Sequence, residues 1–390
     1  MGTLAGCGEA SIFPNIPLTT DPLVLANPIS MVASAVSNRL YVVNSNNRVL
    51  WFDASFVIMD ITNPISPVAI VVVSLPNFSG QIILDEARGF VYIPNRLSTS
   101  EADEEDQVLR ININEASPSF LAMDLIPSAA NSFGASFDGT RLFVACTEDA
   151  LQYNVDSFLG FTSVNMAVVT NEGRELDAMA TRELSISPSG NNLFVTNELD
   201  NMLILNLSQF PPPSVPGETD LGQEGVDYIV TGSASTRGTT TDSSFVYVVS
   251  GAPDALQIMT DTGLDPVVGA PVEIPASALI VGSIPVGTNP GEVIVDEPKM
   301  RAYVSNTGDD TVSIIDLNLE QEIARISVQT TDETQFTGGN FEDGDQPFGM
   351  ALINIGGTNY LYVAHFITNL ISVINVDTLT LVNQFPPQEV

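Results

Sequence analysis

Short apolar segments alternate with polar turns along most of the chain. Residues 302–317 show the pattern clearly, with the sequence AYVSNTGDDTVSIIDL. Tyr303 and Val304 have strand composition, residues 306–310 are turn-forming, and positions 312–317 alternate as on a pleated strand. In the turn, Gly308 can take a positive φ without a Cβ clash. The stretch therefore predicts a β-hairpin.

The first strand of this hairpin has seven copies in the chain. Aligning the aromatic residue of YVSN with YVVN, YIPN, FVAC, FVTN, YVVS and YVAH gives steps of 51, 51, 51, 53, 56 and 59 residues. So regular a spacing indicates a repeat architecture, in which each copy is one supersecondary unit. The aligned aromatic residues are Tyr41, Tyr92, Phe143, Phe194, Tyr247, Tyr303 and Tyr362.

Each repeat contains segments for four strands. A small or polar segment ending in a turn precedes the aromatic motif, as in ELSISPSGNN before Phe194, and an alternating strand follows it. A fourth, apolar strand comes next. The expected fourth strands are 69–75, 119–126, 166–170, 227–232, 279–286, 322–328 and 380–385. Four short strands cannot bury both of their faces alone, so seven such units predict an all-β, seven-bladed β-propeller with four antiparallel strands per blade.

The repeat motifs resemble a known family. YVSNTGDDTVSIIDL, LFVTNELDNMLILNL and YLYVAHFITNLISVINVDTLTLV are similar to YVTN-family β-propeller repeats, and 282–306 resembles that family's blade junction. The resemblance covers about 27–386 and implies the fold, together with a place on a prokaryotic cell surface or in the periplasm. It says little about activity, because propellers include enzymes, binding proteins and structural modules. Cys146 and His365 depart from the motif, since other blades have Asn or Ser there.

The composition restricts the partners. Hydrophobic residues make up 44% of the 390-residue chain, and 47 acidic residues against 12 basic ones give a formal charge of −35. Lys299 is the only lysine. Such a chain repels nucleic acid and anionic lipid, and should attract cations or basic partners, although solubility in a salty medium is a simpler reason for the charge. No apolar run reaches the ~18 residues needed to span a bilayer.

Long connections distinguish the two faces of the expected ring. Segments 45–55, 96–107, 171–182 and 329–346 join a second strand to a third, or an outer strand to the next inner strand, and these connections share one face. The Pro-rich segment 208–225 joins a third strand to a fourth on the opposite face. The first face is expected to be the working surface. The alternative is drift in loop length without a function.

Few residues suggest catalysis. The chain has no Walker loop, zinc-type Cys/His spacing, nucleophile elbow or haem attachment sequence, and its one histidine is His365. A Ser-His-Asp arrangement is conceivable only around His365, which is expected to be a structural residue hydrogen-bonded at a strand end.

The axial channel is the other candidate site. Twelve residues before the repeat aromatics, near the start of the inner strand, stand Gly80, Asn131, Arg182 and Gly291, with Gln81, Glu183 and Glu292 beside them and Arg237 in another inner strand. Arg182 is expected either to clamp a carboxylate or phosphate, or to neutralise Glu183, Glu292 or a nearby aspartate. Candidate ligand-binding residues of this funnel are Arg182, Glu183, Arg237, Glu292 and His365.

The two cysteines and one acidic loop leave alternatives open. Cys7 ends the sequence LAGC, which resembles a bacterial lipobox, although only MGT precedes it where a signal peptide needs a longer apolar region. The alternatives are a Cys7–Cys146 disulfide and two unrelated thiols. The loop FEDGDQ at 341–346, with Asp343 and Asp345, is a weak candidate for calcium, and no other cofactor is expected.

These observations predict residues 1–26 as an N-terminal tether and residues 27–390 as one propeller domain. The expected function is an extracytoplasmic binding or scaffold module, not an enzyme, in the cell envelope or extracellular space. Its partner would be a protein of the envelope or of an extracellular complex, with membrane contact only through lipid on Cys7. The alternative is a lactonase- or lyase-like enzyme in the axial funnel. Residues 22–26 (PLVLA) are expected to lie over the ring closure.

Overall fold

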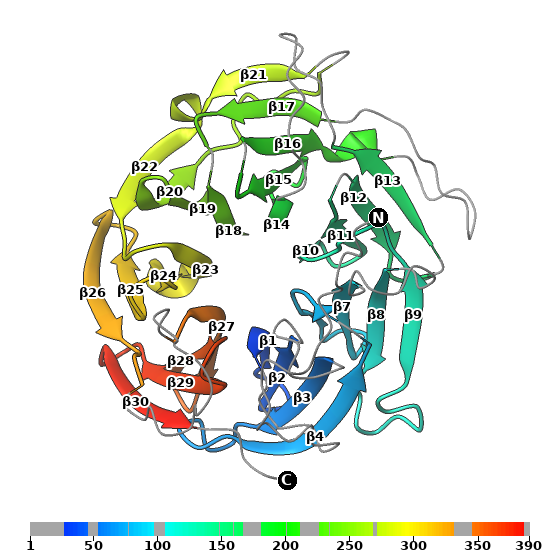
Figure 1. The fold of residues 1–390 in the computed structure, drawn as a ribbon, viewed down its shortest axis with the longest axis vertical. Helices are drawn as coiled ribbons and strands as arrows, with labels where there is room; N and C mark the ends of the chain where they lie inside the picture. The colour runs from blue at the N-terminus through cyan, green and yellow to red at the C-terminus, as the bar shows by residue number, and fades with distance from the viewer. Residues whose placement is uncertain are drawn as a thin grey trace, which may run out of the picture.

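The chain folds into a ring of seven blades around a central axis (Figure 1). A computed structural model describes residues 27–45, 54–76, 78–96, 106–147, 149–158, 160–166, 181–199, 201–210, 226–233, 235–267, 271–330 and 345–385. Each blade is built on four strands in antiparallel order from the axis outward, which confirms the predicted seven-bladed propeller. The described residues contain no helix with the length and apolar character that crossing a membrane requires.

The strand bounds follow the repeat. Blade 1 contains β1 (Pro28–Ser34), β2 (Arg39–Asn44), β3 (Ala54–Asp60) and β4 (Val68–Leu75). Blade 2 contains β5 (Phe78–Ser79), β6 (Ile83–Asp85), β7 (Phe90–Arg96), β8 (Gln107–Asn112) and β9 (Met123–Pro127); β5 and β6 both pair with β7 and together take the place of the inner strand. Blade 3 contains β10 (Ala135–Phe137), β11 (Arg141–Ala145), β12 (Asp149–Asn154) and β13 (Phe161–Asn165). Blade 4 contains β14 (Thr181–Ile186), β15 (Asn192–Asn197), β16 (Met202–Asn206) and β17 (Val226–Thr231).

The last three blades have the same order. Blade 5 contains β18 (Thr236–Thr241), β19 (Val246–Gly251), β20 (Asp254–Met259) and β22 (Ile280–Pro285). Blade 6 contains β23 (Pro290–Asp296), β24 (Arg301–Asn306), β25 (Thr311–Asp316) and β26 (Gln321–Ser327). Blade 7 contains β27 (Pro347–Ile355), β28 (Thr358–His365), β29 (Leu370–Asn375) and β30 (Thr380–Phe385). The described connections include the short 3-10 helices η3 (Leu207–Gln209), η4 (Ala276–Ala278) and η5 (Glu297–Lys299).

The repeat aromatics occupy equivalent places, as predicted. All seven are buried and lie in the second strand of their blade, three residues before the position of the motif Asn. Two local predictions are wrong. The outer strand of blade 3 is Phe161–Asn165 instead of 166–170. In the turn between β24 and β25, Asp310 takes the positive φ (52°), whereas a Cβ on Gly308 would lie 2.9 Å from the Cβ of Asn289, so that glycine is needed for close packing.

An additional strand links blades 4 and 5. β21 (Val272–Pro275) belongs to the connection between β20 and β22 of blade 5, but it pairs in parallel with β17 at the outer edge of blade 4. Figure 1 shows β21 outside β17 at the perimeter of the ring. The connection therefore adds a fifth strand to a neighbouring blade, which the sequence pattern did not predict.

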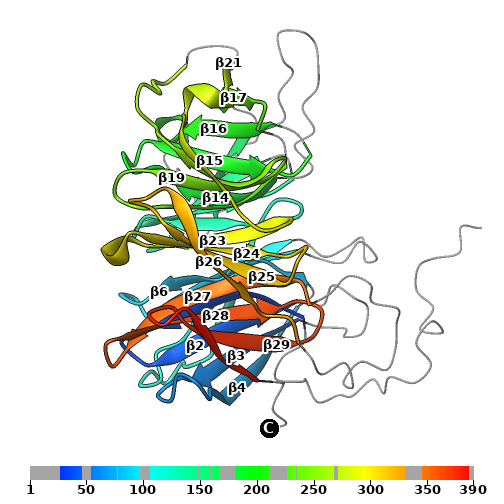
Figure 2. The same ribbon diagram turned by 90° about the vertical axis from the view of Figure 1, so that its left-hand side faces the viewer.

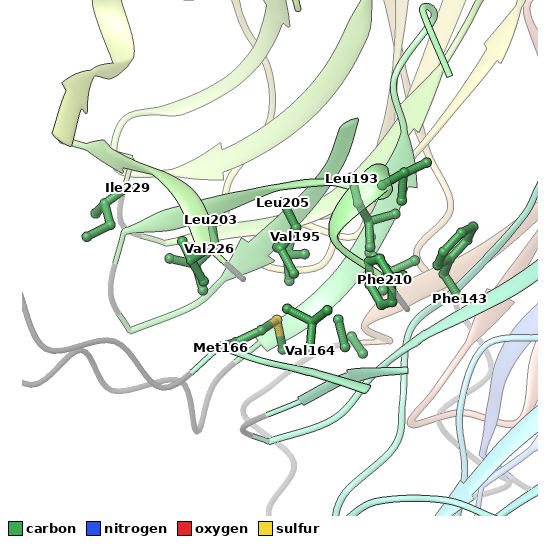
Figure 3. Packing of buried hydrophobic residues seen from close by; sticks show 14 residues of the cluster. Phe143, Val164, Met166, Leu193, Val195, Leu203, Leu205, Phe210, Val226 and Ile229 are labelled. Atoms are coloured by element: carbon green, nitrogen blue, oxygen red, sulfur yellow. The ribbon is translucent and has the colours of Figure 1, made fainter. Parts of the chain in front are cut away.

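The hydrophobic core consists of seven clusters, each between two adjacent blades. Figure 3 shows the cluster between blades 3 and 4, where Phe143, Val164 and Met166 pack against Leu193 and Leu205 of the next blade. Another such cluster joins blade 7 to blade 1. Face-to-face packing of successive sheets thus forms the ring, and every blade buries both of its faces.

Ring closure rests on packing and on a few long-range hydrogen bonds. Asn27 donates its backbone N–H to Asn369 Oδ1 and its side-chain amide to Phe366 O, both at 2.6 Å. The Tyr362 hydroxyl donates to Pro64 O at 2.7 Å. Within the described residues, blades 1 and 7 share no strand, because each is built from one continuous stretch of chain. Residues 22–26, predicted to lie over this junction, and the tether 1–26 fall outside the described residues.

The strand order defines two faces of the ring. Seen from the side in Figure 2, the strands of each blade run between these faces. Connections from second to third strands, and from outer strands to the next inner strands, begin and end on one of them, which we call the loop face. The long connections predicted for one face leave from and return to this face, since the described strands that flank them are β2–β3, β7–β8, β13–β14 and β26–β27. We call the opposite face the hairpin face.

Candidate functional site in the axial channel

Seven equivalent positions on the inner strands form a belt around the axis. Each lies two residues before the inner-strand residue that pairs with the repeat aromatic. In several blades the strand register shifts just before the paired segment, and the belt residue then lies within this irregularity. The belt residues, from blade 1 to blade 7, are Ser30, Gln81, Gly134, Glu183, Gly238, Glu292 and Gly349.

The polar belt residues hydrogen-bond to the next blade. Each uses one side-chain oxygen to accept a hydrogen bond from a backbone N–H of the following inner strand. The pairs are Ser30 Oγ with Ile82 N (3.1 Å), Gln81 Oε1 with Ala135 N (3.0 Å), Glu183 Oε2 with Thr239 N (3.1 Å) and Glu292 Oε2 with Met350 N (2.7 Å). These bonds satisfy donors that a buried inner strand would otherwise leave unpaired.

The glycine belt residues let the next blade approach closely. A Cβ on Gly134 would lie 2.3 Å from the carbonyl oxygen of Arg182, and one on Gly349 would lie 2.4 Å from that of Ile29. A Cβ on Gly238 would lie 2.7 Å from the Cα of Glu292. These distances are shorter than any real Cβ contact, so the three positions require glycine while the blades keep their spacing.

Glu183 and Glu292 bring two carboxyl groups into the channel. The Glu183 side chain is 1% exposed, whereas Glu292 is partly accessible from the channel. Burial raises the pKa of Glu183 to about 7, against the opposing effects of the Thr239 amide and the Arg182 guanidinium. Burial, and then the nearby charge of Glu183, also raises the pKa of Glu292 well above its usual range. Both shifts favour the protonated form of these two carboxyl groups more than in an exposed glutamate.

One oxygen of Glu183 has no partner. Oε2 accepts the Thr239 hydrogen bond, but Oε1 is buried and has no hydrogen bond of normal geometry, although the Gln81 side chain lies near enough to lower the pKa. A buried acceptor without a donor is costly, and such atoms are often completed by a ligand or ordered water.

Arg182 extends across the channel at its loop-face end. Its guanidinium carbon lies 4.7 Å from the ring centre of Phe133 in blade 3 and 5.1 Å from that of Phe348 in blade 7. Because blades 3 and 7 stand on opposite sides of the ring, the side chain reaches the axis. Glu198 Oε1 lies 3.5 Å from Arg182 Nε and 3.2 Å from Arg237 Nε. Among the described residues, the acidic side chain that forms an ion pair with Arg182 is Glu198, and the guanidinium also lowers the pKa of Glu183.

Arg182, Phe133 and Phe348 belong to a second ring of seven equivalent residues, each one position before the belt residue of its blade. This ring surrounds the loop-face end of the channel, which we call the mouth. The ring consists of Ile29, Gly80, Phe133, Arg182, Arg237, Gly291 and Phe348. Counting back from the aromatic residue had placed Asn131 here, which is wrong. Ser136 pairs with Phe143, whereas Ser185 pairs with Phe194, so the hairpin of blade 3 is two residues shorter and Phe133 takes the position.

A cavity of about 550 Å³ extends from the belt away from this mouth. It includes the belt residues Gln81, Glu183 and Glu292, and none of the seven mouth residues. Its walls follow the inner strands toward the hairpin face, with hydroxyl groups from Ser136, Ser185 and Thr239–Thr241 and apolar groups from Val32, Ile83, Val293–Val295 and Leu352. The channel is thus a cup that opens toward the hairpin face, with both carboxyl groups near its closed end.

His365 lies elsewhere, at the loop-face end of β28, and does not line this cavity. Its ring is fully buried, with Nε2 2.7 Å from Ser372 Oγ and Nδ1 3.9 Å from Asp345 Oδ2, too far for a hydrogen bond. Burial lowers the pKa of His365 to about 3. The residues resemble a Ser-His-Asp arrangement, but Ser372 is also fully buried.

Comparison with another repeat explains the structural role of His365. In blade 6, the motif residue Asn306 donates its side-chain amide to Ser313 Oγ at 2.9 Å, seven residues further on. His365 and Ser372 have the same spacing and the same bond in blade 7. His365 therefore makes the hydrogen bond of the motif asparagine, in agreement with the strand-end position expected for it.

Of the other candidate residues, Cys146 and Asp345 are described, and neither lines the channel cavity. Cys146 is a free, buried thiol whose pKa is raised to about 12 by burial, and Cys7 lies outside the described residues. Asp343 is also outside them. Asp345 is buried and accepts the backbone N–H of Thr330. Among the residues that the structure describes, no group of three or more His, Cys, Asp or Glu side chains is arranged to hold a metal ion.

Sequence reasoning named Glu183 and Glu292 but missed how the belt is built. A signal was present in the residues that follow the mouth positions. Blades 3, 5 and 7 have Phe133-Gly134, Arg237-Gly238 and Phe348-Gly349, whereas blades 2, 4 and 6 have Gln or Glu instead of that glycine. The alternation becomes visible only when the inner strands are aligned by their pairing partners, because the hairpins differ in length.

Comparisons with known proteins agree with the fold. No protein-family model matches the sequence, and the search of curated proteins gave no match. Among solved structures, Kuenenia stuttgartiensis hydrazine synthase is 15% identical with a TM-score of 0.58, over 92% of this chain and 97% of that chain. KlHsv2 with loop 6CD replaced by a Gly-Ser linker is 10% identical with a TM-score of 0.52, over 93% and 99%. At these identities the similarity shows that the chain shares the β-propeller fold.

Proposed function

We propose that the protein is an extracytoplasmic binding or scaffold module, built from YVTN-type repeats, that presents its loop face to a protein partner. The observation that carries the proposal is the closed mouth on that face. Arg182 fills the axis between Phe133 and Phe348, while four long connections begin and end around it. A face with a filled centre and long peripheral connections favours a broad protein contact over entry of a small substrate.

The charge of the chain supports a basic partner. A formal charge of −35 creates a negative potential that steers cationic surfaces toward the protein and repels nucleic acid and anionic lipid. The acidic stretch EADEED at 101–106 belongs to one of the loop-face connections. We therefore expect the partner to be a basic protein of the cell envelope or of an extracellular complex.

Pull-down with cross-linking from the native envelope tests this proposal. In one variant, residues 97–105 are replaced by a short Gly-Ser linker between β7 and β8. In the matched control, 211–225 on the hairpin face are replaced in the same way. We expect the first variant to lose the cross-linked partner and the control to retain it. Retention by both variants, or loss by both with intact folds, contradicts a partner that binds at the loop face.

The proposal includes lipid on Cys7, which would hold the domain at a membrane through residues 8–26. That segment is rich in Gly, Pro, Asn and Thr, as in an extended tether. Because the negative charge disfavours adsorption to anionic lipid, an anchor would be needed to retain the protein there. Intact mass of protein from its own membranes is the test. A soluble species that retains Met1–Gly6, or a native Cys7–Cys146 disulfide, excludes the anchor.

An enzyme with its site in the channel is the second candidate. The observation that favours it is the pair Glu183 and Glu292, since a carboxyl group with a raised pKa is suited to general acid–base chemistry. The lactonase- or lyase-like reaction is proposed by analogy with other propeller enzymes. Turnover of a lactone panel by wild type, abolished in Glu183→Gln and retained after replacement of 97–105, would favour this function over a loop-face scaffold.

A further inference from the structure

We infer that the axial cup binds a small organic ammonium ion, with the nitrogen at Glu183 and Glu292 and the apolar part along the inner strands. This inference is independent of the loop-face scaffold, because the cup opens toward the hairpin face. It names a site and a ligand class inside the ring, whereas the proposed partner contacts its rim.

The first argument is the state of the carboxylate oxygens. The Oε2 atoms of Glu183 and Glu292 each accept a backbone N–H from the next blade, which fixes both side chains in place. Glu183 Oε1 remains buried beside the cavity, with the Gln81 side chain nearby but without a hydrogen bond of normal geometry. An ammonium group has three donors, so it can bind Oε1 of both carboxylates and still have a donor for a neighbouring oxygen.

The second argument is the charge balance at the closed end. Arg182, the cation next to Glu183, is engaged on the mouth side, where it lies between two aromatic rings and beside Glu198. The pair of carboxyl groups therefore has one neighbouring guanidinium, beside Glu183, and this guanidinium already has another acidic partner. Their mutual repulsion favours either bound protons or a bound cation, and a cation supplied from the cup would replace the protons.

The third argument is size and lining, which select an organic cation over a metal ion. A volume of about 550 Å³ is in the range of small-molecule sites and is much larger than a bare ion needs. Calcium requires six to eight oxygen ligands, and the described residues show no group of three or more acidic or other metal-binding side chains. The walls instead combine hydroxyl groups of Thr239–Thr241 with apolar Val32 and Ile294, which suit a short aliphatic chain.

The geometry also sets the orientation of the ligand. Arg182 closes the loop-face end, so the charged nitrogen enters first from the hairpin face and stops at the belt. Its chain then points back along Ile83 and Val293–Val295. Anions are excluded by the same carboxylates, and the overall charge of −35 raises the local concentration of cations.

The test uses n-butylammonium chloride as the probe, with n-butanol as a neutral ligand of the same length. Binding is measured by titration calorimetry and by saturation-transfer NMR at pH 8. We expect n-butylammonium to bind wild-type protein with a dissociation constant of about 1 mM or lower, and n-butanol to bind at least about tenfold more weakly. Glu183→Gln should weaken n-butylammonium at least about tenfold. Glu273→Gln, which removes an exposed carboxylate on β21, should leave it unchanged.

Several results would overturn the inference. They are equal binding of n-butanol, binding unaffected by Glu183→Gln, an equal loss in Glu273→Gln, and no binding by wild type at about 10 mM. If Glu183→Gln fails to fold by circular dichroism, Glu292→Gln is measured in its place. Wild type at pH 5 gives a further check, because protonation of both carboxyl groups should abolish n-butylammonium binding. Binding that persists at pH 5 contradicts the site.

Discussion

Two sets of seven equivalent positions tolerate unusual residues in different ways. At the loop-face end of the second strands, His365 replaces the motif Asn and keeps its hydrogen bond, because Ser372 occupies the place that Ser313 has beside Asn306. In the belt, side chains that bridge to the next blade alternate with glycines that admit its backbone. At the strand ends one interaction is conserved with different residues. In the belt, neighbouring blades are kept together either by a side chain that hydrogen-bonds to the next blade or by a glycine that leaves room for its backbone.

The difference between His365 and Glu183 shows which buried ionisable group remains available to a ligand. The polar nitrogen of His365 that faces Ser372 is used within the blade, and the ring has no contact with the channel cavity. Glu183 uses one oxygen for the next blade and leaves the other at the cavity. A buried ionisable group with a displaced pKa is therefore structural in one case and open to a ligand in the other. The following predictions test this contrast, from the largest expected effect to the smallest.

Gly238→Ala should have the largest effect. The new Cβ would meet the backbone of Gly291 and Glu292, which cannot move without separating blades 5 and 6. We expect a loss of about 4 kcal/mol in the free energy of unfolding, or failure to fold. Urea unfolding measures the change. Ser30→Ala, at the same belt position in blade 1, removes one hydrogen bond and should cost only about 1 kcal/mol. Similar losses of unfolding free energy in Gly238→Ala and Ser30→Ala would contradict the different roles of glycine and polar residues in the belt.

His365→Ala and His365→Asn should differ strongly in their free energies of unfolding. The alanine variant leaves a cavity and an unpaired Ser372 hydroxyl in a fully buried site, which should cost about 3 kcal/mol. Asparagine restores the motif bond and should cost about 1 kcal/mol. Equal losses in urea unfolding at pH 8 would show that the bond seen in blade 6 does not carry over to blade 7.

The pH dependence of His365→Asn provides a second measurement. The folded-state pKa of His365 is about 3, below its unfolded value, so this group stabilises the protein above pH 6.5 and the stabilisation is lost as pH falls. Wild type should lose about 2 kcal/mol relative to His365→Asn between pH 6.5 and pH 5. A constant difference between the two proteins over this range contradicts a buried, neutral imidazole.

Glu183→Gln should show the opposite pH dependence of stability. Because burial raises the folded-state pKa of Glu183 to about 7, its stability contribution is fully present below the unfolded pKa and is lost as pH rises toward 7. The amide can still accept from Thr239, so the variant should be more stable than wild type by about 2 kcal/mol at pH 8. At pH 4 the two should be equally stable. A variant that is less stable than wild type at pH 8 would contradict the burial effect.

Arg182→Gln should have the smallest effect on stability. Loss of the guanidinium between Phe133 and Phe348 should cost about 1 kcal/mol. It should also raise the pKa of Glu183 further, since this guanidinium lowers it. Carbon-detected NMR titration of the glutamate carboxyl groups measures the shift. Arg237→Gln, which also faces Glu198, is the control and should move that pKa less.

The ring itself was predictable from the sequence because it follows from local features. The spacing of Tyr41, Tyr92 and their equivalents fixed the number of blades, and alternation within each unit fixed the order of strands. The misplaced outer strand of blade 3 and the unpredicted β21 have one cause. β13 directly precedes a long connection and β21 lies within one. In such places apolar segments of similar composition compete, and tertiary pairing selects among them.

The site was predictable only in part. The sequence identified Glu183, Glu292, Arg182 and Arg237 as channel residues, and the structure brings all four to the axial region. It could not show that Glu198 pairs with both arginines, or that Arg182 reaches Phe348 three blades away, because these contacts depend on the diameter of the ring. It also could not separate His365 from the channel, since the distance between a strand end and the axis has no local signal.

The absence of a shared strand between blades 1 and 7 in the described residues has a mechanical consequence. A pulling force on the two ends of the ring acts directly on this junction, where side-chain packing and isolated hydrogen bonds such as that of Tyr362 with Pro64 carry the load. Blades 4 and 5, by contrast, are fastened by the backbone pairing of β17 with β21. Under tension we expect the ring to open first into a curved array, and blades 4 and 5 to yield together as one unit.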